Sequence, residues 1–208
     1  MKSIGHTHAE LPVAAPIMVL PNAVLFPHAL MPLFIFEPRY RVMLAHTLEQ
    51  DRMFCVAMMK PGVTEAQSQD DFHHVAGIGL VRACVGHENG TSHLVLQGLA
   101  RVRFGELVQD KPFRIAQIRE LQTPPSDEKK VEALGSRVRE ACLKVPVADR
   151  ELREKLKEQI AGISHPGALA DLAAHAFLED PVRQQEVLEE LDLAARLRMV
   201  LQALREES

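Results

Sequence analysis

Proline density near the amino terminus constrains the fold of this chain more than any other feature. The mostly apolar segment from residue 20 to 40 contains Pro21, Pro27, Pro32 and Pro38. Each ring removes a backbone N–H donor and collides with the preceding helical turn, so one continuous helix cannot form there. The residue before each proline also prefers an extended backbone. The segment is therefore predicted to consist of short extended pieces joined by rigid turns.

The first half of the chain has the pattern of short β-strands. Apolar runs or alternating patterns predict strands at Ile17–Leu20, Leu30–Phe36, Met53–Met59, Val75–Val85, His93–Gln97, Val102–Phe104 and Phe113–Ile115. One amphipathic helix interrupts them, because Tyr40, Met43 and Leu44 share a face and Pro38 suits a first helical turn. Many short strands with one small helix predict a closed or nearly closed barrel, with a sandwich as the alternative.

The apolar period changes to helical spacing after Thr123-Pro124-Pro125-Ser126. Apolar stripes at this spacing predict helices at Val131–Ala141, Leu152–Ile160, Leu169–Phe177, Leu188–Leu191 and Leu193–Leu204. Asp180 and Asp192 are candidate N-caps, and Pro181 suits the first helical position. The sequence thus predicts an α+β chain, with a barrel over residues 1–122 and a helical bundle over residues 123–208.

Composition limits the classes of function. The net charge is −4 and the pI is about 6.2, which disfavours binding to nucleic acid phosphates as the main task. The three cysteines, Cys55, Cys84 and Cys142, form no CxxC motif and are odd in number, so a reducing compartment is expected. The sequence contains no run of eighteen consecutive apolar residues, so no transmembrane helix is predicted. We expect a soluble, cytoplasmic protein.

No residue pattern builds a convincing catalytic or metal site. His73 and His74 are adjacent and would face opposite sides of a strand. His6 and His8 could share an ion if extended, but they lie in a terminus that is expected to be disordered. Cys55 and Cys84 lie within apolar strand runs and are predicted to be core residues, and Cys142 lies on a predicted helix beside its apolar stripe. We therefore expect no catalytic residue, no metal and no cofactor, and an enzyme acting on a small molecule is the least favoured hypothesis.

Six motifs, in order along the chain, resemble the amino-terminal domain of the Lon protease family. They are Leu20–Pro27, Pro32–Tyr40, Val75–Gly79, Leu94–Arg103, Pro166–Ala174 and Gln184–Leu197. One departure is Gln184, where the family usually has lysine. The resemblance implies a PUA-like β-barrel followed by a helical bundle. It also implies a role in recognising substrate polypeptides.

The sequence lacks the parts of Lon that act on bound chains. There is no G-x-x-x-x-G-K-[ST] loop for nucleotide phosphates, and residue 208 falls before the ATPase and protease domains of full-length Lon. The resemblance therefore implies a non-catalytic module for unfolded or flexible polypeptide segments, working with a separate protease or ATPase. The alternative is a nucleic-acid-binding PUA-like barrel, which the acidic balance and the single tyrosine disfavour.

The proline-rich segment provides the candidate peptide-binding residues. We expect Phe26, Leu30, Met31 and Leu33 to include exposed side chains that form an apolar patch. In the alternative interpretation, large residues of this segment such as Leu25, Phe34 and Phe36 fill the barrel core. Arg101 and Arg103 are expected on the solvent side of a strand, with a grip on a carboxylate or phosphate as the alternative. A leftover apolar face on the Leu-rich final helix predicts a homodimer.

Overall fold

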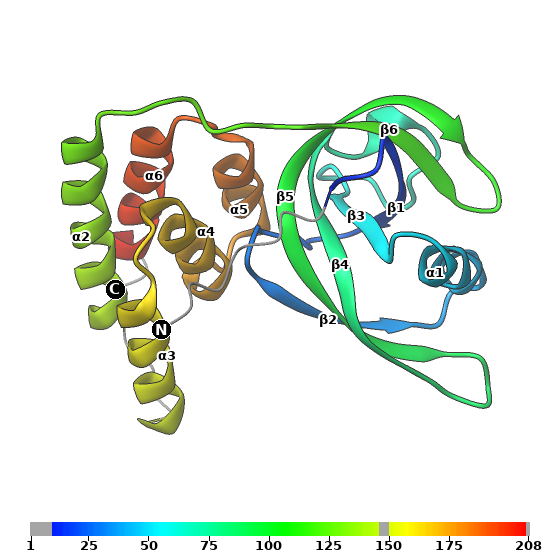
Figure 1. Cartoon of the computed structure of the whole chain (residues 1–208), viewed down its shortest axis with the longest axis horizontal. Coiled ribbons are helices and arrows are strands. Elements are labelled where there is room, and N and C mark those ends of the chain that lie inside the picture. The colour runs from blue at the N-terminus through cyan, green and yellow to red at the C-terminus, as the bar shows by residue number, and fades with distance from the viewer. Residues whose placement is uncertain (1–9, 146–149, 207–208) are drawn as a thin grey trace.

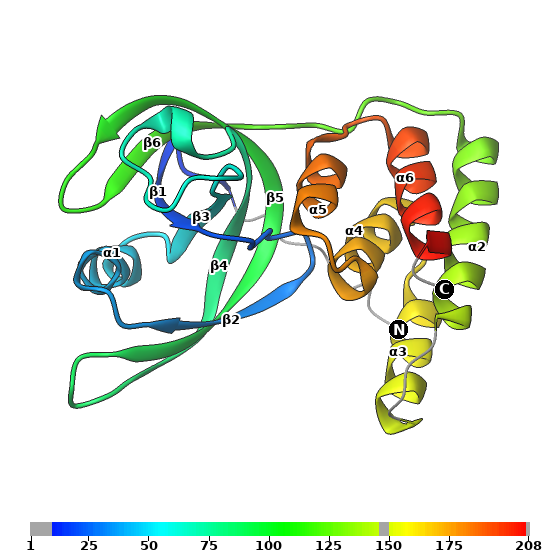
Figure 2. The same cartoon turned by 180° about the vertical axis from the view of Figure 1, so that it is seen from behind.

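The structure, a computed structural model, describes residues 10–145 and 150–206, with side chains left undescribed at residues 150–153 and 156. His6 and His8 lie outside these residues. A β-rich half and a helical half lie side by side, joined by an extended segment between the last strand and the next helix (Figure 1). The view from behind shows the same two halves (Figure 2).

The described strands form one six-stranded sheet in the order β2-β5-β4-β3-β1-β6. Their bounds are β1 (Ala14–Leu20), β2 (Leu30–Ile35), β3 (Met53–Met58), β4 (Val75–Gly86), β5 (Ser92–Gln109) and β6 (Arg114–Glu120). The β1–β3 pair is parallel and the other pairs are antiparallel. Because β5 also pairs with β6, the sheet closes into a barrel. The predicted α+β architecture of barrel and bundle is confirmed.

The strand β5 is continuous where the sequence analysis predicted two strands, His93–Gln97 and Val102–Phe104. Its first part pairs with β2 and its second part with β6, so β5 belongs to both the closed barrel and an extension beyond it. Gly98 lies at the change of partner and does not end the strand. A Cβ atom there would overlap the carbonyl oxygen of Phe26, so glycine allows the proline-rich segment to cross close to β5.

The helices are α1 (Pro38–Glu49), α2 (Glu128–Lys144), α3 (Arg150–Gly162), α4 (Pro166–Phe177), α5 (Pro181–Glu189) and α6 (Leu193–Glu206), with a short 3-10 turn at Gln69–Asp71. Their starts follow local signals. Pro38 and Pro181 occupy first-turn positions, and the Asp180 carboxylate accepts the N–H of Val182. Within the described residues, no helix is both long and apolar enough to cross a bilayer.

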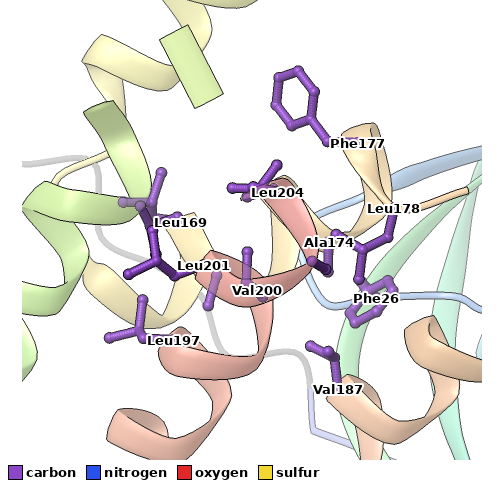
Figure 3. Close-up of a cluster of buried hydrophobic side chains, with 14 of the residues drawn as sticks. Phe26, Leu169, Ala174, Phe177, Leu178, Val187, Leu197, Val200, Leu201 and Leu204 are labelled. Carbon is purple, nitrogen blue, oxygen red and sulfur yellow. The ribbon is translucent and has the colours of Figure 1, made fainter. Parts of the chain in front are cut away.

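Barrel and bundle share a hydrophobic core. Val24, Phe26, Ala29, Met58 and Val75 from the barrel half belong to the same buried cluster as side chains of the helices. Figure 3 shows Phe26 beside Ala174, Leu178 and Val187 of the helical half. The expected boundary between residues 122 and 123 falls in the segment that links β6 to α2.

The apolar face of α6 is used inside the bundle. Leu197, Val200 and Leu204 are almost fully buried and pack in the cluster that also contains residues of α2 and α4. The leftover face that predicted a homodimer is therefore absent from this helix, because neighbouring helices cover it. The dimer itself stays a prediction without that face to support it.

Candidate functional site

An uncovered apolar surface lies on the sheet formed by β2, β5 and β4, where it extends beyond the closed barrel. We call it the apolar face and define it by Pro32, Phe34, Ala83, Val85, His93 and Val95. The strand register aligns Pro32 with Val95 and Ala83, and Phe34 with His93 and Val85. Side chains of aligned residues share one side of a sheet. They line a shallow groove of about 390 Å³.

The large apolar side chains of this face are well exposed. Phe34 is 49% exposed and Val85 is 61% exposed, and the adjoining Leu30 and Phe36 are 55% and 58% exposed. The rings of Phe34 and Phe36 stack with centroids 5.8 Å apart, and the His93 ring lies 4.6 Å from that of Phe34. Apolar groups so close together on a surface are typical of a binding site.

The interpretation that placed Leu25, Phe34 and Phe36 in the barrel core is correct for Leu25, which is fully buried, and wrong for Phe34 and Phe36. Side chains alternate along β2, so Ile35 points into the core cluster that includes α1 while Phe34 points away from it. No described element covers the other side of the extension at these residues. The exposure of this side was hidden in the sequence because both sides of β2 are apolar.

The four candidate peptide-binding residues have different positions. Leu30 is exposed beside the apolar face, as expected for a binding residue. Met31 and Leu33 are half-buried and pack toward the core cluster of α1. Phe26 is fully buried between barrel and bundle, so its expected exposure is wrong: the close crossing at Gly98 directs this side chain into the helices.

The sequence analysis missed the contribution of β4 and β5 to this surface. Val85, His93 and Val95 complete the groove, and these residues lie more than forty positions after the proline-rich segment in the sequence. One available signal was the run Val75–Val85, which is apolar at successive positions and therefore on both sides of its strand. That pattern allows an uncovered apolar side as well as a buried one.

The groove is almost free of formal charge. None of the described residues that line it is Asp, Glu, Lys or Arg. The rim is polar: the His87 Nε2 and His93 Nδ1 atoms are hydrogen-bonded at 2.8 Å, and the Arg82 Nε atom donates to Gln97. Such a surface suits uncharged apolar groups of a ligand, while polar groups of the ligand can be hydrogen-bonded at the rim.

The thiols and histidines do not form a catalytic arrangement in the described residues. Burial raises the pKa of Cys55 far above its ordinary value and raises the pKa of Cys142 to about 12. A protonated, buried thiol is a poor nucleophile. No three side chains of His, Cys, Asp or Glu lie together as metal ligands within the described part of the chain.

Arg101 contradicts the expected solvent side of its strand. Its guanidinium is 5% exposed and binds both carboxylate oxygens of Asp171, at 2.8 Å and 2.5 Å, while its Nε atom donates to the Leu188 carbonyl. Arg196 contributes a second guanidinium, 3.5 Å from Asp171. Helices α4 and α5 cover the barrel at Arg101, whereas Arg103 two residues later is exposed. The alternative interpretation, in which this arginine binds a carboxylate, describes Arg101, but the carboxylate is that of Asp171 in the same chain.

A family comparison identifies the chain. The model of the ATP-dependent protease La (LON) substrate-binding domain matches residues 14–206, which is nearly every residue that the structure describes. The chain belongs to this family. Arg101 and Asp171 come from two of the Lon-like motifs quoted above, and their ion pair shows that these motifs join the barrel to the bundle.

Two relatives are Lon protease 2 of Myxococcus xanthus, 31% identical, and a Lon protease of Anaeromyxobacter dehalogenans, 30% identical. Each match covers 94% of this chain but only 24% and 23% of the relative, so the chain spans about a quarter of their length. The same fold occurs in the amino-terminal domain of a Mycobacterium avium complex Lon protease. That match has a TM-score of 0.76 at 15% identity and covers 94% of this chain and all of the other.

Proposed function

We propose that this chain is a non-catalytic polypeptide-binding module that holds apolar segments of unfolded or flexible chains. The observation that carries the proposal is the apolar face, where exposed Phe34 and Val85 flank a groove lined by uncharged residues. Membership of a family described as substrate-binding supports the same function. The ligand is the polypeptide itself, and no cofactor takes part.

Unfolded chains suit this surface because they expose apolar side chains that folded proteins bury. Covering the exposed half of a phenylalanine removes on the order of 100 Å² of apolar surface from water and contributes about 2 kcal/mol. Two or three such side chains contribute about 4–6 kcal/mol before the entropy lost on binding is subtracted, so this face alone gives weak binding, with a dissociation constant of about a millimolar or more. Weak, reversible binding of this kind suits many different sequences.

The module would act together with a separate protease or ATPase. The matched relatives are called Lon proteases, and this chain corresponds to about a quarter of each. We infer that the chain presents bound segments to a protease or ATPase that unfolds or cleaves them. The unpaired cysteines of the described residues favour a reducing compartment such as the cytoplasm.

Binding to a permanently unfolded protein tests the proposal. A reduced and carboxymethylated protein carrying a fluorescent label would be titrated with this chain, and its anisotropy measured. Phe34→Ser with Val85→Ser removes the two large apolar groups from the face, while Val108→Ser changes a valine that is equally exposed, at 61%, elsewhere on β5. All three positions are on the surface, so the variants should fold.

We expect the wild type and Val108→Ser to bind with similar affinity. The double variant should bind at least about tenfold more weakly, because two apolar contacts are lost. Equal binding by the double variant would show that the apolar face is not the site. No binding by the wild type, at low or high salt, would overturn the proposed function.

A further inference from the structure

The edge of β2 that does not pair with β5 lies next to the apolar face, and a peptide could in principle add there as a further strand. In the described residues β2 pairs on one side only, with β5. An exposed edge of this kind offers backbone N–H and C=O groups to an extended ligand. Whether a bound segment uses this edge or the face depends on which backbone groups remain available.

The register determines which groups point outward. The Gly98 N–H donates to the Ala29 carbonyl, and Leu30 is aligned with Gln97. In an antiparallel pair, residues that bond to the partner alternate with residues whose N–H and C=O face away. Met31, Leu33 and Ile35 therefore bond to β5. Leu30, Pro32 and Phe34 direct their backbone groups to the open edge.

The middle one of these three outward positions lacks its hydrogen-bond donor. Pro32 has no N–H to donate, which removes the central donor of the edge. Leu30 and Phe34, four residues apart, keep both groups, so the alternating ladder of an added strand is interrupted at its centre.

We propose that a bound segment lies across the apolar face and is held through its side chains, without adding as a strand to β2. This inference rests on the proposed function and specifies its mode. The matching ligand is an uncharged segment rich in aromatic and branched apolar residues, because the groove offers stacked rings and no charged side chain. Its backbone amides are not required for recognition.

Backbone methylation separates the two modes of binding. Three fluorescein-labelled decapeptides would share one apolar side-chain sequence: one unmodified, one N-methylated at odd positions and one at even positions. Each methyl group removes an amide donor, so one methylated peptide or the other must lose the bonds of any added strand. Loss of each bond weakens binding by roughly two- to tenfold.

We expect the three dissociation constants to agree within about threefold, since side-chain contacts persist. Phe34→Ser should weaken all three peptides to the same extent, and Val108→Ser should change none. A loss of more than about tenfold for either methylated peptide would establish strand addition and overturn this inference, while leaving the proposed function intact. Failure of all three peptides to bind the wild type would overturn both.

Discussion

The ion pair between barrel and bundle allows a quantitative test of how the two halves are joined. Asp171→Asn keeps the size of the side chain and removes its charge. Arg101 and Arg196 would then remain buried, at 5% and 2% exposure, without the carboxylate that lies between them. Breaking a buried pair in this way typically costs about 3–5 kcal/mol, because the remaining charge keeps its desolvation penalty.

The lower end of that range applies here. The asparagine oxygen can still accept one hydrogen bond, and Arg101 keeps its bond to the Leu188 carbonyl. We therefore expect a loss of about 3 kcal/mol in the free energy of unfolding. For a chain of this length the melting temperature should fall by about 6–12 °C.

Urea unfolding followed by circular dichroism measures the effect. The midpoint should fall with an unchanged slope if barrel and bundle still unfold together. Arg103→Met on the same strand is the matched control, and its exposed side chain predicts a change within about 0.5 kcal/mol. A loss below about 1 kcal/mol for Asp171→Asn would refute the reasoning. It would mean that the shared apolar core alone holds the two halves together.

Two further predictions concern the proline-rich segment and its contacts. Gly98→Ala should lower the free energy of unfolding by about 3 kcal/mol or more, because the added Cβ atom would overlap the Phe26 carbonyl oxygen. Gly162→Ala is the control, since a Cβ atom at Gly162 would meet open space. Equal urea midpoints for the two variants would contradict the close crossing at Gly98. Burial lowers the pKa of His175 below its ordinary 6.5, so the unfolded chain binds more protons and stability should fall as pH drops through 6.5. His175→Gln should reduce this loss between about pH 7.5 and 5.5 in urea titrations, and an unchanged pH dependence would contradict the assignment.

Local signals in the sequence were sufficient for the secondary structure of the helical half. Asp180 and Pro181 mark the start of α5 through hydrogen bonding and backbone geometry within one turn. The helical face of Tyr40, Met43 and Leu44 likewise becomes the buried face of α1. These features depend on residues a few positions apart, which the sequence displays directly.

The sequence by itself determined that prolines divide the first half into extended pieces, that helices follow residue 123, and that the motifs are Lon-like. Only the tertiary structure decided that Phe26 is buried, that Phe34 is exposed and that Arg101 meets Asp171. The physical reason is that burial on a strand depends on what covers each of its two sides. Helices α1, α4 and α5 supply the residues that cover parts of β2 and β5. No local pattern in the sequence shows that these helices leave the apolar face uncovered.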